Sequence, residues 1–285
     1  MKNILVVGAG GALGQTLLAL IKRETGWNVI GIAKGSRVME MLMAADYDRV
    51  KQELDLRVDV IINTAALTNV DRCEVEREQA WKTNVVIVER LARYCLLNTI
   101  KLVQCSTDNV FDGQDGPYDE KAGTHPVNYY GRTKLAAENL CRATEIESLI
   151  VRTMWLYGST TRLAFVEWLV AEMKAGKAVK VAYDEVGNPT HYEDLAWGII
   201  AAIERNVRGT LHLAGRERMT RLEMAQLITD RLKLDATLLV PVTSAELQRA
   251  AKRPLNSGLI STRAVSDVGY QARSLGECIR SGGWN

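Results

Sequence analysis

The chain has 285 residues, of which 47% are hydrophobic and 25% are charged, with a formal net charge of +2. This length and composition predict a packed core in one large α/β domain or in a larger domain with a smaller lobe. The small net charge gives no electrostatic reason to expect a nucleic-acid or membrane partner. The five scattered cysteines form no CxxC pair, and the three histidines have no metal-ligand spacing. No apolar run approaches the roughly 18 residues of a membrane span. We therefore expect a cytoplasmic protein with reduced thiols and no metal site.

The first motif is a glycine-rich turn between a predicted strand and a predicted helix. The apolar run Asn3 to Val7 is typical of a strand buried on both faces, and helical periodicity follows the glycines. Glycines in this context allow a tight turn and bring the backbone close to a dinucleotide pyrophosphate at the helix N-terminus. The spacing is GxxGxxG, and the residues that we assign to this cofactor turn are Gly8, Gly11, Ala12, Leu13 and Gly14.

The residues after the second predicted strand, 27–32, bear on the choice of cofactor. NAD-specific sites place an acidic residue about 20 positions beyond the glycines, where it binds the ribose 2′-hydroxyl. This chain has no carboxylate there, and Lys34 and Arg37 could instead hold a 2′-phosphate. We therefore favour NADP(H) over NAD(H), although a solvated basic loop is the alternative. Ala65 and Ala66, after the next strand, are small enough for close passage beside the cofactor.

The remaining elements alternate between strands and helices as far as residue 157 and more loosely beyond it. Capping boxes at Thr220 with Glu223 and at Thr243 with Glu246 each predict the start of a helix. Asn84 is the polar exception on a helical face and is either a satisfied core group or a support for a neighbouring loop. Strands are predicted over 59–63, 101–105, 148–152, 179–181 and 210–213, and helices over 44–54, 74–97, 130–143, 163–176, 192–205, 220–232 and from 243 toward 251.

Tyr130 and Lys134 form a Tyr-x-x-x-Lys pair at the start of a predicted helix. Residues four apart lie on the same helical face. An ammonium beside a phenol favours the phenolate and lowers the pKa of the phenol, so that it can exchange a proton with a substrate oxygen. The pair alone is weak evidence, because such spacing is common on exposed helices. Thr107, at the carboxyl end of the preceding strand, and the glycine turn strengthen it.

A series of motifs identifies a family. In chain order they are GAGGALG, NTAALTNVD, CSTDNVFDG, YYGRTK, RTMWLYG, NPTHYEDLA and RPLNSGL. With these motifs the chain resembles the extended short-chain dehydrogenase/reductase family and, more narrowly, the dTDP-4-dehydrorhamnose reductases. The resemblance covers nearly the whole chain. The late RPLNSGL segment makes the narrower match more specific.

The resemblance implies both a fold and a function. The fold would be a Rossmann-type doubly wound parallel sheet with helices on both faces and a smaller C-terminal α/β substrate lobe. The Rossmann domain would comprise 1–157 plus about 190–215, and the nucleotide-sugar lobe about 158–189 plus 216–285. The implied reaction is reduction of dTDP-4-dehydrorhamnose to dTDP-L-rhamnose with NAD(P)H. A homodimer and a divalent-ion requirement are known for some relatives, but the sequence locates neither.

The resemblance also implies roles for individual residues. Tyr130 would protonate the developing alkoxide, Lys134 would lower the pKa of Tyr130 and hold the nicotinamide ribose, and Thr107 would hydrogen-bond the keto oxygen. For Trp155, a core tryptophan is the alternative. The residues that would bind substrate are Asp108, Asn109, Trp155, Arg253 and Asn256, with Ser257 nearby.

Two departures from the family pattern leave the substrate open. Asn109 and Leu67 stand where the family frequently has tyrosine, which could mean another 4-keto sugar or no turnover. Related 4,6-dehydratases use an Asp-Glu pair after the threonine, and Asn109 cannot act as an acid or base. A reductase or epimerase acting on a different nucleotide sugar also fits the sequence, and so does a non-catalytic NADP-binding regulatory subunit, because fold alone does not fix function.

Overall fold

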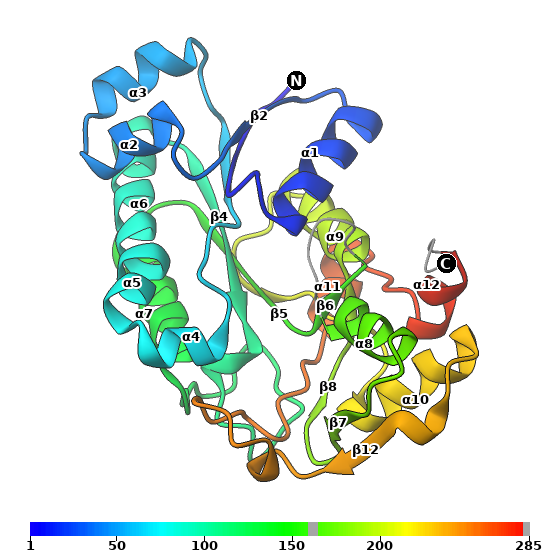
Figure 1. The fold of residues 1–285 in the computed structure, drawn as a ribbon. Coiled ribbons are helices and arrows are strands. Elements are labelled where there is room, and N and C mark those ends of the chain that lie inside the picture. Colours follow the sequence, from blue (N-terminus) through cyan, green and yellow to red (C-terminus); the bar gives the residue numbers. More distant parts are fainter. Residues whose placement is uncertain (159–164, 282–285) are drawn as a thin grey trace.

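A central sheet of six parallel strands organises the computed structural model, which describes residues 1–158 and 165–281 (Figure 1). Its strands carry the near-continuous apolar runs that a sheet covered on both faces requires. In spatial order they are β2 (Asn28–Ile32), β1 (Asn3–Val7), β3 (Val60–Asn63), β4 (Lys101–Thr107), β5 (Ser148–Thr153) and β10 (Gly209–His212).

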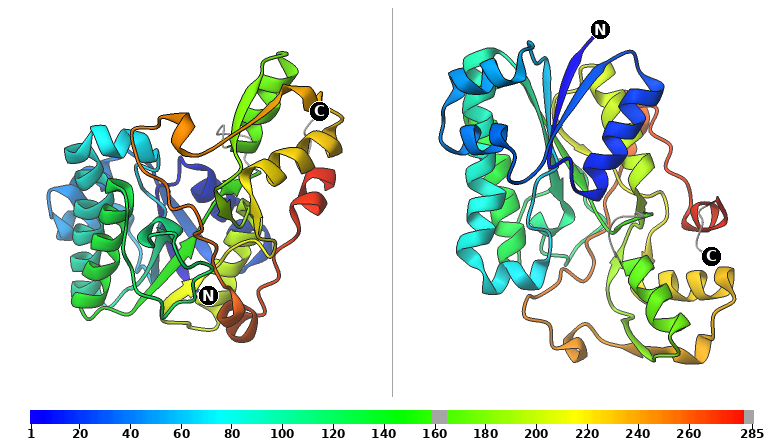
Figure 2. Two further views of the ribbon diagram at one scale, coloured as in Figure 1. Left: turned by 90° about the horizontal axis from the view of Figure 1, so that it is seen from below. Right: turned by 45° about the horizontal axis from the view of Figure 1, so that its top comes forward.

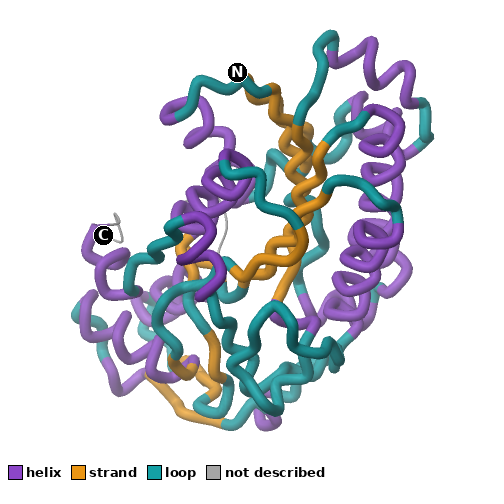
Figure 3. The backbone as a smooth tube through the Cα atoms, turned by 180° about the vertical axis from the view of Figure 1, so that it is seen from behind, coloured by secondary structure: helices purple, strands orange, loops and turns teal. Residues whose placement is uncertain are grey.

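Helices cover both faces of the sheet, as the views from the front and from behind show (Figures 1 and 3). On one face, α1 (Ala12–Glu24) packs on α9 (Tyr192–Glu204), and α9 packs on α11 (Thr262–Val268). On the other face, α6 (Ile87–Asn98) packs on α2 (Arg37–Met43) and α7 (Tyr129–Ala143), and α3 (Tyr47–Leu54) packs on α2. Two separate apolar clusters fill the layers. This arrangement confirms the predicted doubly wound α/β fold.

The strand order locates the ligand edge of the sheet. β2 and β3 lie on opposite sides of β1, so the chain reverses direction across the sheet at the β1–β3 pair. In open parallel sheets, ligands bind outside the carboxyl ends of the strands at such a reversal. Gly8 follows β1 and Thr64 follows β3, so both lie at this edge.

A further apolar cluster lies beyond the ligand edge, at the lower right of Figure 1, and we call the elements around it the small lobe. Its helices are α8 (Phe165–Lys174), α10 (Arg221–Leu232) and α12 (Leu275–Ser281). The strands beside them are the parallel pair β7 (Val179–Ala182) and β12 (Leu239–Val242), and the antiparallel pair β8 (Val186–Gly187) and β11 (Met219–Thr220). β6 (Leu156–Tyr157) pairs with β9 (Thr190–His191) next to α8. The capping box predicted at Thr220 and Glu223 is confirmed at the start of α10.

The helix predicted from Thr243 toward Ala251 is wrong. Thr243 and Glu246 do exchange the hydrogen bonds of a capping box, but only a single 3-10 turn, Ala245–Leu247, follows. The turn ends at Gln248, whose φ of 48° lies in the left-handed region. The chain then leaves the small lobe as an extended segment (orange, bottom of Figure 1) and binds the larger one, where the Ala251 amide donates to Asp71 at 2.9 Å. These tertiary contacts override the local helix signal.

Two other helix predictions need correction. The predicted helix 44–54 begins only at Tyr47, because Ala45 has a φ of 59°, and α2, which precedes it, was not predicted. The predicted helix 74–97 is divided into α4 (Val70–Val75), α5 (Arg77–Trp81), a π-helical turn at Lys82–Val86 and α6. Residues 163–164 of the predicted helix 163–176 lie outside the described residues.

Three further features bear on the sequence predictions. None of the described helices is long and apolar enough to cross a membrane. All five cysteines are free thiols, as expected. Within 1–158 and 165–281, no group of three or more His, Cys, Asp or Glu side chains gathers in a metal-binding arrangement.

His212 on β10 supplies a test of the buried sheet at acidic pH. Burial, and to a lesser degree the Arg152 guanidinium, lower the pKa of this fully buried imidazole to about 3. The unfolded chain binds a proton below about pH 6.5, whereas the folded chain does not, so stability falls as pH drops from 6.5 toward 3. Over this pH range we expect the free energy of unfolding to fall less in His212→Gln than in the wild type, by up to a few kcal/mol. Urea unfolding at pH 7.5 and 4.5 measures it, and equal losses in both proteins would contradict the assignment.

Candidate active site

A cleft of about 2040 Å³ lies at the carboxyl edge of the sheet and extends to the small lobe. Pockets that hold one small ligand usually measure about 300 to 1,000 Å³, so this cleft has room for two. The larger lobe contributes the glycine turn, the residues after β3 and β4 and the start of α7. The small lobe contributes residues that include Phe165, Trp168, Lys180 and Arg221.

The glycine turn can approach a ligand closely because no side chain fits within it. Gly8 has a φ of 90°, and a Cβ there would lie 2.6 Å from the Ala65 amide nitrogen. A Cβ on Gly14 would lie 2.4 Å from the Gly8 carbonyl oxygen. Glycine at both positions therefore lets the turn, α1 and the residues after β3 come together. The predicted cofactor residues Gly8, Gly11, Ala12, Leu13, Gly14, Ala65 and Ala66 all line the cleft.

The two basic residues after β2 lie in different surroundings. Lys34 lines the cleft beside Ala33. Arg37 is the first residue of α2, and its guanidinium lies 3.4 Å from the Glu53 carboxylate. Arg37 does not line the cleft formed by the described residues. The sequence could not separate the two cations, because α2 and its contact with α3 were not predicted.

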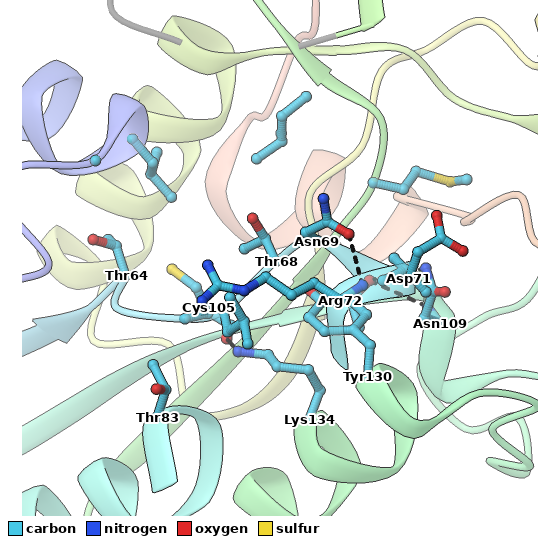
Figure 4. A pocket seen from close by; sticks show the side chains of 18 of the residues that line it. Thr64, Thr68, Asn69, Asp71, Arg72, Thr83, Cys105, Asn109, Tyr130 and Lys134 are labelled. Atoms are coloured by element: carbon cyan, nitrogen blue, oxygen red, sulfur yellow. Dashed lines mark hydrogen bonds between the residues drawn. The ribbon is translucent and has the colours of Figure 1, made fainter. Parts of the chain in front are cut away.

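The Tyr130–Lys134 pair lies in the first turns of α7, which begins one residue before the predicted start (Figure 4). Asn128 caps the helix by accepting a hydrogen bond from the Gly131 amide at 2.8 Å. Both side chains of the pair are buried and line the cleft. The Lys134 ammonium donates to the Cys105 carbonyl oxygen at 2.6 Å. Burial lowers the pKa of Lys134, so the ammonium is less costly to deprotonate here than in water.

Thr107 ends β4 and is joined to its two successors. Its hydroxyl donates to Asp108 Oδ1 at 2.9 Å and accepts from the Asn109 amide at 3.2 Å. The Asn109 side chain donates to Asp108 Oδ1 at 3.0 Å and accepts from Asn128 Nδ2 at 2.9 Å. Asn109 therefore connects the end of β4 with the cap of α7. All three residues after Ser106 line the cleft.

The extended segment after Gln248 reaches this site from the small lobe. Ser257 donates to Asp108 Oδ2 at 2.6 Å, and the Arg253 guanidinium forms an ion pair with Asp71 at 2.5 Å. Burial raises the pKa of Asp108, while the hydrogen bond from Ser257 acts in the opposite direction. Arg253 lines the cleft, whereas Asn256 does not, because its side chain donates to the Gly116 carbonyl at 2.9 Å.

An aromatic and cationic wall faces the site from the small lobe. The Arg221 guanidinium lies 3.5 Å from the Trp155 ring centroid and 4.7 Å from that of Phe165. Trp155 has a φ of 47°, a strained conformation of the kind that concentrates at functional sites. Burial lowers the pKa of Arg221 to about 10. Trp155 lines the cleft and is therefore not only a core residue.

Several residues in or beside the cleft were not found from the sequence. Arg221 follows the Thr220 cap and reads as an ordinary first-turn residue, and Asp71 and Asn128 belong to short polar runs without a distinctive pattern. Asn84 carried a signal, since it was the polar exception on a helical face. It is fully buried, accepts from the Leu67 amide at 2.7 Å and donates to Thr133 at 2.9 Å. It is therefore both a satisfied core group and a support for the loop after β3.

Comparison with known proteins is consistent with this geometry. The chain is 34% identical over 271 residues to a dTDP-4-dehydrorhamnose reductase of Mycobacterium tuberculosis, covering 91% of this chain and 85% of that protein. It is 31% identical to methionine adenosyltransferase 2 subunit beta of Xenopus laevis, covering 90% and 80%. The dTDP-4-dehydrorhamnose reductase of Bacillus anthracis in complex with NADP has a similar fold, with a TM-score of 0.89, 30% identity and 98% of each chain covered. The model of the RmlD substrate binding domain matches residues 1–281, and the chain therefore belongs to that family of extended short-chain dehydrogenases/reductases.

Proposed function

We propose that this chain is an NAD(P)H-dependent reductase of a nucleotide-linked 4-keto-6-deoxy sugar, and that it converts dTDP-4-dehydrorhamnose to dTDP-L-rhamnose. The observation that carries the proposal is a single cleft lined by the glycine turn and by Thr107, Tyr130 and Lys134. Its volume exceeds that of a one-ligand pocket, as a reaction between a dinucleotide and a nucleotide sugar requires. The reductases of Mycobacterium tuberculosis and Bacillus anthracis support the same assignment.

The glycine turn fits a dinucleotide because Gly8, Gly10 and Gly11, which have no Cβ atom, line the cleft before the start of α1. The helix N-terminus offers amide hydrogens and a partial positive charge to a pyrophosphate. A reduced nicotinamide bound in this cleft would supply a hydride to the C4 carbonyl carbon of the sugar. Lys34 supports a preference for NADP(H), since its ammonium lines the cleft near the end of β2 and can pair with a 2′-phosphate.

The catalytic residues would manage the charge that forms on the keto oxygen. Tyr130 donates its phenolic proton to that oxygen, and the Lys134 ammonium favours the phenolate that remains. Lys134 is oriented by the Cys105 carbonyl, which leaves two of its three N–H bonds for other partners. Thr107, held by the Asn109 amide, can turn its hydroxyl proton from Asp108 to the keto oxygen.

The small lobe would bind the nucleotide sugar. Arg221 stacks on Trp155 and Phe165, which presents a cation and apolar faces on the same side of the cleft. A guanidinium suits a pyrophosphate and aromatic faces suit a base. Both the nitrogen and the oxygen of the Asn109 side-chain amide are hydrogen-bonded within the protein, and an amide cannot act as an acid or base. Both facts argue against a dehydration reaction. Asp108 and Arg253 are paired with Ser257 and Asp71 within the protein. They would shape the wall of the sugar site rather than pair with a charge on the substrate.

A non-catalytic role is the second candidate, because the chain is 31% identical to methionine adenosyltransferase 2 subunit beta of Xenopus laevis. Such a subunit could retain the fold without turnover. The presence of Thr107, Tyr130 and Lys134 in one cleft favours the enzyme. Tight NADPH binding without oxidation in the presence of dTDP-4-keto-6-deoxy sugar would favour the subunit instead.

Tyr130→Phe tests the proposed proton donor. We expect kcat to fall by about 10² to 10⁴-fold, because the variant lacks the proton donor, while the dissociation constant of NADPH stays within about twofold. Loss of absorbance of the reduced cofactor with dTDP-4-dehydrorhamnose measures turnover. Tyr129→Phe, which removes the hydroxyl of the adjacent tyrosine, is the matched control and retains activity. Equal activity of Tyr130→Phe and the wild type would disprove this mechanism.

Lys34→Asp tests the proposed 2′-phosphate contact. A carboxylate repels the phosphate and can bind a free 2′-hydroxyl, so the ratio of kcat/KM for NADPH to that for NADH should fall about tenfold or more. Steady-state kinetics with both cofactors provide the measurement. Arg37→Ala should change the ratio less, since Arg37 pairs with Glu53. An unaltered ratio in Lys34→Asp would show that Lys34 does not read the phosphate.

A further inference from the structure

A buried carboxylate lies on α7, about one helical turn beyond the proposed catalytic pair. Glu138 is on α7, four residues after Lys134, and its side chain is fully buried. Its Oε1 accepts from Ser106 Oγ at 2.6 Å and from Arg152 Nε at 2.9 Å. Its Oε2 accepts from Arg152 Nη2 at 2.7 Å and from Arg142 Nη2 at 2.8 Å. Hydrogen bonding and ion pairing with Arg152 keep the pKa of Glu138 low although burial raises it.

These partners form one row across the sheet, just before the proposed active site. Arg152 on β5 is the register partner of Ser106 on β4 and of His212 on β10. Lys134 binds the carbonyl of Cys105, and Glu138 binds the side chain of the next residue. Lys134 and Glu138, on successive turns of α7, therefore bind the consecutive β4 residues Cys105 and Ser106. Thr107 is the next residue of the strand.

Fold stability alone does not account for this arrangement. Taking a carboxylate and a guanidinium out of water is costly, and an apolar pair of similar size is frequently as stable or more so. The pair here is almost completely buried, with exposed side-chain fractions of 2% for Arg152 and 0% for Glu138. A charge retained at this depth beside the Lys134 ammonium points to a role in setting the electrostatics of the site.

The surroundings of Lys134 show what that role would be. The titratable groups acting on its ammonium are the thiols of Cys73 on α4, Cys105 on β4 and Cys141 on α7, together with Glu138. Burial raises the pKa of these thiols to about 11, 11 and 12, so they are uncharged at neutral pH. In this set the negative charge at neutral pH therefore belongs to Glu138, and it opposes the effect of burial on Lys134. The Arg152 and Arg142 guanidiniums, which pair with this carboxylate, act in the opposite direction.

We propose that Glu138 and Arg152 are a positioning pair for the reductase reaction. They fix α7 against the end of β4, and the Glu138 carboxylate balances the Arg152 guanidinium, so that this buried positive charge does not lower the pH at which Lys134 and Tyr130 lose their protons. The inference rests on the proposed function, because it assigns Lys134 and Tyr130 their roles.

Glu138→Gln separates this role from a purely structural one. Glutamine keeps the size and an acceptor but removes the charge, and it leaves Arg152 unbalanced. The local potential becomes more positive, so Lys134 and Tyr130 release their protons at lower pH. Since reduction needs the protonated phenol, the basic limb of the pH profile of kcat/KM should move down by about one pH unit. Glu138→Gln with Arg152→Gln restores the charge balance and should return the limb toward its original position.

Asp267→Asn, which removes the carboxylate of the exposed Arg263–Asp267 pair, is the matched control and should leave the profile unchanged. A lower melting temperature with an unshifted basic limb would show that Glu138 is merely structural and would overturn the proposal. If Glu138→Gln does not fold, the double variant still decides. Its profile should match that of the wild type, and a limb displaced by a full unit would refute the charge-balance account.

A second readout does not depend on turnover. Trace labelling with acetic anhydride at a series of pH values, followed by peptide mass spectrometry, reports the fraction of Lys134 that is deprotonated. The midpoint for Lys134 should move to lower pH in Glu138→Gln, and an unchanged midpoint would overturn the proposal. If the wild type does not oxidise NADPH with any 4-keto sugar, the proposed function fails, whereas this labelling experiment still tests the effect of Glu138 on Lys134.

Discussion

The hydrogen bond from Lys134 Nζ to the Cys105 carbonyl fixes where α7 meets the sheet. Because Cys105 is two residues before Thr107, this bond places the start of α7 beside the end of β4. Asn109 completes the link by joining Asp108 to Asn128, the cap of the same helix. The proposed proton donor, Tyr130, and the residue that would orient the keto oxygen, Thr107, thus belong to one hydrogen-bonded unit. Such pre-organisation is what positioning and electrostatic catalysis require.

The rest of the molecule supplies ligands to that unit from two directions. The glycine turn approaches from the strand reversal between β1 and β3, where glycines without a Cβ atom line the cleft. The small lobe approaches from the opposite side (Figure 2), and Ser257 in the extended segment donates a hydrogen bond to Asp108. A substrate in the cleft would therefore contact both lobes. The Asp108–Ser257 and Asp71–Arg253 contacts connect the two lobes.

Much of this architecture was accessible from the sequence, for identifiable reasons. Buried parallel strands are continuous apolar runs, and the glycine spacing and the Tyr130–Lys134 pair are local patterns, so β1 to β5 and α7 were placed well. What failed depended on distant contacts. Thr243 and Glu246 form a capping box without a helix, because residues from 251 onward bind the other lobe. Arg37 pairs with Glu53, and Arg221 enters the cleft, through packing that no local pattern encodes.

Hydride transfer to C4 of a nucleotide-linked sugar is the step that we propose for this cleft. The most direct test is to incubate the protein with dTDP-4-dehydrorhamnose and NADPH deuterated at the transferring position of the nicotinamide, and then to analyse the product by mass spectrometry and NMR. We expect dTDP-L-rhamnose with one deuterium, located at C4, formed in proportion to the cofactor oxidised. Cofactor oxidation without deuterium at C4, or bound cofactor with no product under any condition, would contradict it.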